Sequence, residues 1–286
     1  MINAITKITN NLGLKRFQLK RLDRFETLNY LIDNNLSISR FGDGECSIAF
    51  DHKGIHFQEY SDDLKDKLLK VLTTKNDKIL VSFNNSFVDE SKYRVIVKYG
   101  RTGKVYDSFE TIKLANDIGI LERKNEQIFY KGKFREIRRI FKNPILGDAT
   151  VFYIGFYYKE YQKANLEIVF ELYKRLFKDK RILFVCPENP LMSKSFRTLI
   201  EEGVIQSHED ATFYFVPSTN AFSKYKEILE SILERQDTFD LVIIQAGPTA
   251  TVLAHELSTK HNIKAYDVGS LNESIYKVWM DTNFIF

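Results

Sequence analysis

The amino-acid sequence predicts an α/β protein built on a mostly parallel, doubly wound sheet. Short apolar runs alternate with stretches of helical length, most clearly after residue 180. This alternation is typical of parallel strands joined by crossover helices. The chain has 286 residues, of which 44% are hydrophobic, enough for one large domain with a full core.

The first half of the chain contains two predicted strands and two predicted helical regions. The helix over 61–73 is favoured by acidic residues in its first turn and lysines later, as the helix dipole prefers. The expected order is basic helical material at 2–35, a strand at 36–40, the helix at 61–73 and a buried strand at 78–83. In terms of domains, we expect a basic helical segment at 1–26 and a single domain at 27–286.

The pattern is weak between residues 84 and 160. The basic cluster at 131–142 favours a short helix, and 147–155 is aromatic and turn-rich, which argues against a regular helix there. In the second half, the predicted elements alternate as strand 181–186, helix 193–202, strand 211–216, helix 221–236, strand 240–246, helix 249–260 and strand 264–268. Ligands of such sheets bind beyond the carboxyl ends of the strands, so the loops that follow the strands are the candidate site.

The sharpest chemical motif is RFGDGE at residues 40–45, where a predicted strand ends. The carboxylates of Asp43 and Glu45 are hard oxygen ligands that can share one Mg²⁺ or Mn²⁺, which takes further ligands from a substrate diphosphate. Gly42 and Gly44 allow a tight turn and close backbone approach. Arg40 can contact phosphate or carboxylate, and Phe41 belongs to the same candidate nucleotide-binding loop. The alternative interpretation is an acidic surface turn that caps the next element.

A second motif joins a strand to a helix through Gly247, Pro248 and Thr249. The N–H groups at a helix N-terminus form an anion site, so these residues are candidates for nucleotide binding. The motif is neither GxGxxG nor a Walker sequence, and it predicts no dinucleotide or ATP site. A simple capped turn is the alternative.

The loop after the strand at 211–216 repeats this arrangement. Pro217, Ser218 and Asn220 lie in the loop and Lys224 lies one turn inside the helix, so all four are candidate nucleotide contacts. The alternative is an ordinary N-cap, which uses the same residue types.

A fourth strand end carries Asp267, which can orient a hydroxyl or act as a catalytic base. Glu256 and Glu273 are further candidates for the base, and the sequence does not rank the three. We interpret the neighbouring His255 as a packing residue.

Charge is distributed unevenly along the chain. The formal net charge is +4, but residues 1–24 hold six Lys and Arg against one Asp, so the rest of the chain sums to −1. A basic nucleic-acid-binding surface on the domain is therefore not expected. Residues 1–24 favour peripheral contact with the anionic inner leaflet of a membrane. A solvated helix face or a contact in a homo-oligomer is the competing interpretation.

Composition also bears on the compartment. No run of about 18 apolar residues occurs, so we expect no transmembrane helix. The only cysteines are Cys46 and Cys186, without metal-ligand spacing, which suits a reducing cytoplasm. We expect a cytoplasmic protein, with the inner face of the membrane as its possible peripheral site.

Four segments together resemble, in order and spacing, the GT-D type glycosyltransferases of bacterial adhesin glycosylation and surface polysaccharide clusters. They are RFGDGE at 40–45, VPSTNAFSKYKEIL at 216–229, QAGPTATVLAHEL at 245–257 and AYDVG at 265–269. The similarity covers residues 27–280. It implies a Rossmann-like fold, a nucleotide-sugar donor that is typically UDP-linked, and a divalent Mn²⁺ or Mg²⁺ held by the DxE pair Asp43 and Glu45.

The resemblance implies transfer of a hexose to a glycan, glycoprotein or lipid-linked acceptor. The sequence departs from the family in two places. The family often continues the last strand as DIGHID, whereas Gly269 is followed here by Ser270, and the segment after Cys186 lacks a glycine-rich acidic stretch. Two alternatives therefore stay open: an inactive nucleotide- or glycan-binding module, and another nucleotide-using enzyme such as a methyltransferase.

Overall fold

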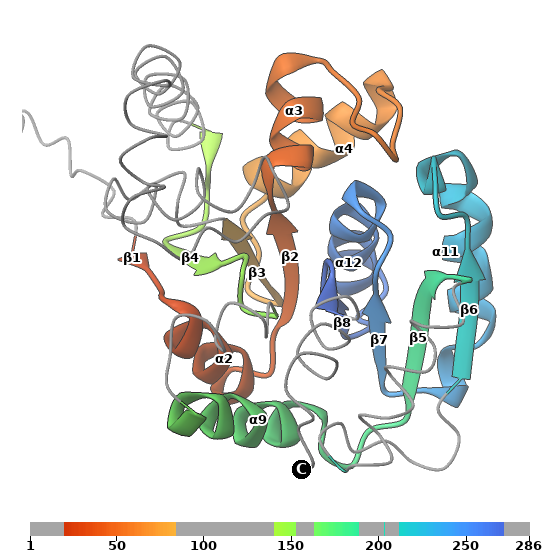
Figure 1. Ribbon diagram of the computed structural model, residues 1–286. Helices are drawn as coiled ribbons and strands as arrows, with labels where there is room; N and C mark the ends of the chain where they lie inside the picture. Colours follow the sequence, from red (N-terminus) through yellow and green to blue (C-terminus); the bar gives the residue numbers. More distant parts are fainter. Residues whose placement is uncertain (1–19, 84–139, 153–162, 189–202, 204–211, 272–286) are drawn as a thin grey trace, which may run out of the picture.

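The computed structural model describes residues 20–83, 140–152, 163–188, 203 and 212–271. Within these residues, eight strands form one sheet in the order β1-β4-β3-β2-β8-β7-β5-β6 (Figure 1). Every neighbouring pair is parallel. The strands are β1 (Lys20–Arg21), β2 (Ser37–Phe41), β3 (Ile79–Phe83), β4 (Ile145–Asp148), β5 (Ile182–Pro187), β6 (Thr212–Val216), β7 (Leu241–Ile244) and β8 (Ala265–Asp267).

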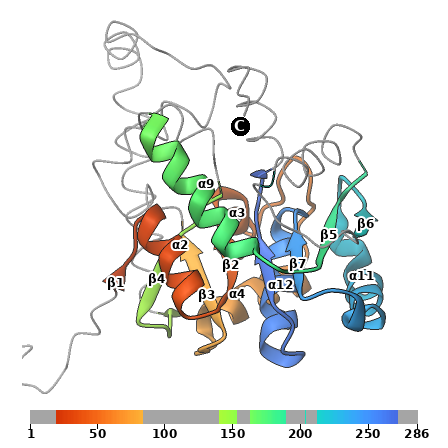
Figure 2. The same cartoon turned by 90° about the horizontal axis from the view of Figure 1, so that it is seen from below.

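Helices cover both faces of the sheet, so the described part of the molecule has three layers. One hydrophobic cluster joins one face to α3, α4, α11 and α12, and the other joins the opposite face to α2 and α9. Figure 2 shows α2 and α9 next to each other on one face of the sheet. The helices are α2 (Arg24–Asp33), α3 (Asp43–Asp51), α4 (Asp62–Thr73), α9 (Lys163–Phe177), α11 (Tyr225–Glu234) and α12 (Pro248–Lys260), with 3-10 turns η2 (Ala221–Lys224) and η3 (Gln236–Thr238).

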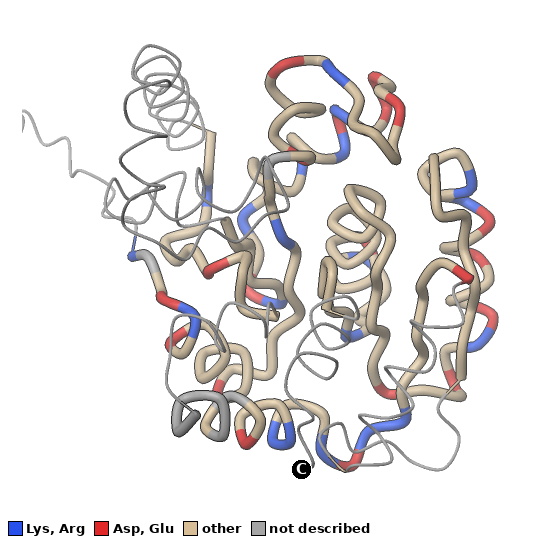
Figure 3. Tube along the Cα trace, in the orientation of Figure 1, with Lys and Arg blue, Asp and Glu red and all other residues tan. Residues whose placement is uncertain are grey.

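The central strands are apolar because both of their faces are covered. All five residues of β2 and all five of β3 are buried, as expected where helices pack on both sides of a parallel sheet. In Figure 3 the central strands are mostly tan, and charged residues gather on the outer helices and turns. This pattern confirms the predicted doubly wound parallel sheet.

Most predicted elements appear near their expected positions. The predicted strands at 36–40, 78–83, 181–186, 211–216, 240–246 and 264–268 correspond to β2, β3, β5, β6, β7 and β8. The helix predicted at 61–73 is α4, which Ser61 caps by accepting a hydrogen bond from the N–H of Leu64 at 3.3 Å. The predicted helix at 221–236 is divided into η2 and α11. The helix predicted at 193–202 and nearly all of 131–142 lie outside the described residues.

The expectation of basic helical material over 2–35 is wrong at Lys20–Arg21. These two residues pair with β4 as an edge strand: the N–H of Lys20 donates to the carbonyl of Pro144, at 2.9 Å. Asp23 then starts α2 with a capping box, accepting from the N–H of Glu26 while the Glu26 carboxylate accepts from the N–H of Asp23. Such a cap is a strong start signal. Helix α2 therefore begins at Arg24 and crosses the boundary expected after residue 26.

None of the helices in the described ranges combines the length and the apolar composition that crossing a membrane would require.

Candidate functional site

The sequence motifs meet at one edge of the sheet, where β2, β6, β7 and β8 end. In Figure 1 the arrowhead of β2 points to α3, and β7 leads directly into α12. Strands β2 and β8 are neighbours in the sheet. Strand β2 ends at Phe41, and β8 ends at Asp267. The carboxyl edge that the sequence analysis selected is therefore where these motifs lie.

The acidic pair does not lie in a loop. Asp43 and Glu45 are the first and third residues of α3, and Gly42 is its N-cap. The N–H of Gly42 donates to Oε2 of Glu45 at 2.7 Å, which stabilises this helix start. A loop was expected at both residues, whereas the structure has the first turn of a helix there. The side chain of Asp43 lies outside the described part of the structure.

Glu45 is half-buried, and its carboxyl group is perturbed by its surroundings. Burial, followed by the negative charge of Asp267, raises the pKa of Glu45 to about 7, and the nearby Arg40 guanidinium opposes this shift. Because a raised pKa means that the ionised form lacks full compensation, a cation beside this group would be favoured.

Arg40 is a buried cation held by Asp267. The two residues are 7% and 3% exposed. The Nε of Arg40 lies 3.6 Å from Oδ1 of Asp267, and the backbone N–H of Arg40 donates to Oδ2 at 3.1 Å. Burial raises the pKa of Asp267, and Arg40 counteracts it. Asp267 thus fixes the position of Arg40 through these two contacts.

Two further residues close this arrangement, and the sequence analysis named neither as a site residue. The Thr251 hydroxyl, on the first turn of α12, lies 2.9 Å from both the carbonyl of Arg40 and Oδ2 of Asp267. Gly269 has φ +54°, and a Cβ there would lie 2.2 Å from Nη2 of Arg40. The absence of a side chain at Gly269 therefore makes room for the guanidinium.

A turn between α3 and α4 connects the acidic motif to α12. Ile55 and Gln58 pair across this turn through backbone hydrogen bonds of 2.8 and 3.1 Å. A Cβ on Gly44 would lie 2.9 Å from Cδ1 of Ile55, and a Cβ on Gly247 would lie 2.6 Å from the ring of Phe57. Gly44 and Gly247, which belong to two separate motifs, thus leave room for the side chains of Ile55 and Phe57 in this turn.

The same turn binds the loop after β6. The N–H of Asn220 donates to the carbonyl of Phe57 at 2.8 Å. The Asn220 side-chain oxygen accepts from the N–H of Glu59 at 2.6 Å. Gln58, 5% exposed, accepts from the N–H of Phe222 at 3.2 Å and from the Thr249 hydroxyl at 3.4 Å. Phe57 and Gln58 were missed from the sequence because their partners are far away along the chain.

The other predicted nucleotide contacts differ from one another in their surroundings. Phe41 is buried and its ring stacks on Phe83, with ring centroids 5.9 Å apart. Pro248 and Thr249 are buried. Pro217 and Ser218 are exposed in their loop. Lys224 is exposed and pairs with Glu227 at 2.8 Å.

Of the alternative candidates for a base, Glu256 is engaged away from the acidic motif. Glu256 lies two turns into α12 and is engaged by Tyr225 at 2.5 Å and by Lys260 at 2.7 Å. His255 is 7% exposed, and its Nε2 has no hydrogen-bond partner among the described residues. Burial lowers the pKa of His255 to about 4, which fits a neutral packing residue. Glu273 lies outside the described residues.

A hard divalent cation fits this donor set only in part. Over the described ranges, no group of three or more His, Cys, Asp and Glu side chains converges as a metal cage. A carboxylate whose pKa is raised by burial and by a second carboxylate is, however, a suitable donor for such an ion. A Mg²⁺ or Mn²⁺ that keeps waters and binds a substrate phosphate needs only one or two carboxylates.

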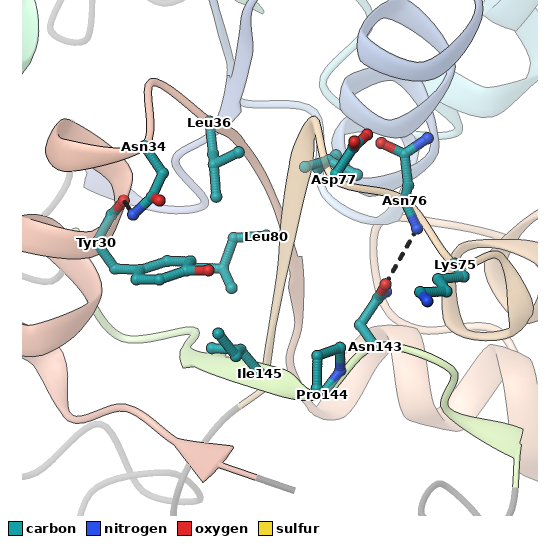
Figure 4. Close-up of a pocket in the computed structure, with 11 residues that line it drawn as sticks. Tyr30, Asn34, Leu36, Lys75, Asn76, Asp77, Leu80, Asn143, Pro144 and Ile145 are labelled. Atoms are coloured by element: carbon teal, nitrogen blue, oxygen red, sulfur yellow. Dashed lines mark hydrogen bonds between the residues drawn. The ribbon is translucent and has the colours of Figure 1, made fainter.

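A separate cavity of about 570 Å³ lies at the opposite, amino edge of the sheet. Tyr30, Leu80 and Ile145 form an apolar side, and Asn143 accepts from the N–H of Asn76 at 3.1 Å (Figure 4). None of the predicted site residues lines it. The cavity is therefore separate from the acidic motif.

In open α/β sheets, ligands bind in the crevice outside the carboxyl ends of the strands, which is where the acidic start of α3 lies. A family model described as the glycosyltransferase GT-D fold matches residues 38–116 and 112–282. The chain belongs to this glycosyltransferase family, as the resemblance of the sequence motifs predicted.

Similar proteins agree with this assignment. The chain is 24% identical over 280 residues to a probable glycosyl transferase Gly of Streptococcus gordonii, covering 95% of this chain and 35% of that protein. It is 25% identical over 279 residues to glycosyltransferase GlyD of Streptococcus pneumoniae serotype 4, covering 96% and 29%. The chain thus spans about a third of the length of these curated relatives.

Solved structures show the same fold. A domain of unknown function 1792, described as having a distinct glycosyltransferase fold, matches with a TM-score of 0.64 and 25% identity, covering 93% of this chain and 83% of that one. A glycosyltransferase of this type from Streptococcus sanguinis matches with a TM-score of 0.64 and 21% identity, covering 93% and 86%.

Proposed function

We propose that this chain transfers a hexose from a nucleoside diphosphate, with UDP as the expected carrier, to a hydroxyl of a glycan, glycoprotein or lipid-linked acceptor. The observation that carries the proposal is the joining of the acidic start of α3 to the start of α12 at the carboxyl edge of the sheet. Membership of the GT-D family supports the reaction class.

The diphosphate lies beside the first turn of α3 in this proposal. The positive end of the helix dipole favours an anion there. Asp43 and Glu45 would hold a Mn²⁺ or Mg²⁺, which supplies Lewis-acid stabilisation of the negative charge on the departing diphosphate. Glu45 is suited to this task because its carboxylate is poorly compensated by its own surroundings.

Arg40 contributes the positive charge that the protein itself provides. Its guanidinium lies close enough to lower the pKa of Glu45, and Asp267 holds it in place. Because Asp267 is buried and already accepts hydrogen bonds from Arg40 and Gly269, we assign it a positioning role instead of the role of a base.

The proposal is tested with the full chain, a panel of UDP-hexoses and Mn²⁺, by following release of UDP. Asp43→Asn and Glu45→Gln should each reduce turnover by about a hundredfold or more, as expected when a group that stabilises leaving-group charge is lost. Asp63→Asn, at the exposed first turn of α4, is the matched control and should leave turnover unchanged.

Unchanged turnover in both site variants would contradict the assignment of the acidic motif. Binding of UDP by the wild type with no turnover of any UDP-hexose would instead support a nucleotide-binding module without activity.

A further inference from the structure

The turn between α3 and α4 exposes an aromatic ring at the proposed site. Phe57 is 44% exposed, although it is a large apolar side chain. Among the described residues only two other large hydrophobic side chains, Ile168 and Phe215, are exposed to a similar extent. A single exposed hydrophobic residue is ordinary, so the position and rigidity of this ring must decide what it does.

The ring is held firmly. It lies on Gly247, where any Cβ would come within 2.6 Å of it. The carbonyl of Phe57 accepts from the N–H of Asn220 at 2.8 Å, and the pairing of Ile55 with Gln58 fixes the turn on either side. One side of the ring is therefore supported by backbone, and the exposed remainder faces solvent.

The turn that carries this ring also contacts the acidic motif. Ile55 contacts Gly44 in the first turn of α3. The Cα atoms of Ile55 and Phe57 are at most about 7 Å apart, because two residues cannot span more. The next loop contributes exposed Ser218 and Thr219, whose hydroxyls suit the edges of a ribose and a base.

We propose that Phe57 is the stacking platform for the base of the nucleoside diphosphate, an assignment that rests on the proposed function. Every nucleobase has a π-face that stacks on an aromatic ring. With the diphosphate beside α3, the base extends over the turn to Phe57. The absence of a side chain at Gly247 then leaves room for the Phe57 ring. The start of α12 contacts the ring, and the ring contacts the base.

The experiment measures the dissociation constant of UDP, GDP and ADP, each with Mn²⁺, for the full-length wild type and for variants of Phe57, by isothermal titration calorimetry. Phe57→Ala and Phe57→Leu should weaken binding of the preferred nucleotide by between about fivefold and about a hundredfold, the range expected for loss of one base–aromatic stack. Phe57→Trp should bind as tightly as wild type or more tightly. The leucine variant keeps an apolar side chain but has no aromatic face, so it distinguishes stacking from burial of apolar surface.

Two controls accompany these variants. Phe215→Ala removes the same kind of side chain with the same exposure of 44%, from a ring that stacks on Phe213 at 6.1 Å on the α2 and α9 side of the sheet. It should leave nucleotide affinity unchanged. Inorganic pyrophosphate with Mn²⁺, which has no base, should bind wild type and Phe57→Ala equally.

The outcomes separate this inference from the function on which it rests. If wild type binds and turns over a UDP-hexose while Phe57→Ala binds UDP equally well, the platform is wrong and the function stands. An effect of Phe57→Ala confined to the KM for the nucleotide-sugar, with unchanged UDP affinity, would assign the ring to the hexose and overturn the proposal. If wild type binds none of the three nucleotides, the nucleotide-sugar donor and the platform both fail.

Discussion

The residue that most constrains the site is Arg40, a cation placed inside the sheet. A buried charge is tolerated only where it is paired and hydrogen-bonded. Asp267 supplies the counter-charge, and the backbone carbonyl of Val268 accepts from Nη1 at 3.4 Å. Glu45 adds a second negative charge, so one guanidinium faces two carboxyl groups whose pKa values are both raised by burial.

Replacing Asp267 with Asn should destabilise the protein by about 3 kcal/mol, because it removes the carboxylate that pairs with the buried Arg40 guanidinium. Urea denaturation at pH 7 measures the change. The matched control is Asp240→Asn, which breaks a half-exposed pair with Arg181 whose atoms are 3.0 Å apart. This control should cost under about 1 kcal/mol. Equal effects at the two positions would show that Asp267 does not anchor Arg40.

A buried histidine should make stability depend on pH. The pKa of His255 is lowered to about 4 by burial, followed by the positive charge of Lys70, whereas the unfolded chain titrates near its ordinary value of about 6.5. Between these values the unfolded state is protonated and the native state is neutral. The contribution of His255 to the free energy of unfolding is therefore fully present above about pH 6.5, and it is lost as the pH falls toward 4.

His255→Leu should remove this part of the pH dependence. The difference in unfolding free energy between wild type and variant should change by about 2 kcal/mol between pH 7.5 and pH 4.5, with wild type losing more. Urea denaturation at both pH values measures it, and the carboxyl groups with raised pKa contribute equally to both proteins. A difference that is independent of pH would mean that the pKa of His255 is the same in the folded and the unfolded protein.

At the scale of elements, the turn between α3 and α4 organises the site. It contacts the start of α3 through Ile55, the start of α12 through Phe57 and the loop after β6 through Gln58. The three motifs identified from the sequence are thus held together by a segment that the sequence analysis had not singled out. Local patterns identify strand ends and helix starts, whereas contacts across more than 160 residues leave no local signal.

Gly247→Ala should test this connection. Gly247 has φ +54° and ψ −140°, a backbone region that other residues rarely adopt, and its new Cβ would also meet the Phe57 ring. We expect a loss of about 1–3 kcal/mol from the backbone strain, together with weaker UDP binding because the ring is displaced. Gly203→Ala provides the comparison, since Gly203 also has a positive φ, +69°, but nothing lies within 4 Å of its Cβ position.

The Gly203 variant should show strain without any effect on UDP affinity. If Gly247→Ala lowers the melting temperature but binds UDP as wild type does, the position of the Phe57 ring does not depend on its contact with Gly247.

The predictable elements were those with a long or strongly patterned signal. Strands β2, β3, β5, β6, β7 and β8 are apolar runs bounded by polar residues, and α4 has a cap and a dipole-matched charge pattern. Strands β1 and β4 have only two and four residues, too few to show a period. Helix α3 was expected as a turn because of Gly42 and Gly44. The helix forms there because Glu45 caps it and its side chains Cys46, Ile48 and Ala49 are buried.

Helix α9 was left unassigned in the sequence although it has fifteen residues. It packs against α2 and contributes Tyr173 and Phe177, both fully buried, to the second core cluster. Its apolar face is completed only by tertiary packing. The location of the candidate site at the carboxyl edge follows from the strand pattern alone, whereas the pairing of Arg40 with Asp267 required the adjacency of β2 and β8.

At the scale of the whole molecule, the excess positive charge lies at one end of the sequence. The excess of Lys and Arg lies in residues 1–24, while the remaining residues sum to −1. Lys20 and Arg21 form β1, at the edge of the sheet next to β4, which places the first described cations at the side of the molecule away from α11 and β6. We propose that the Lys and Arg residues of this segment attract the chain to a negatively charged surface.

Deletion of residues 1–19 should therefore weaken binding to vesicles that contain anionic lipid. This deletion removes Lys7, Lys15 and Arg16 but keeps β1 and the cap at Asp23, so loss of the fold is not expected. Each cation near an anionic surface contributes about 1 kcal/mol, and the interaction is screened by salt. Cosedimentation with phosphatidylserine vesicles should show a fall of about tenfold or more, with neutral vesicles as the control. Equal partitioning of the deletion variant and the full chain would assign the basic segment to solvent or to contacts between copies.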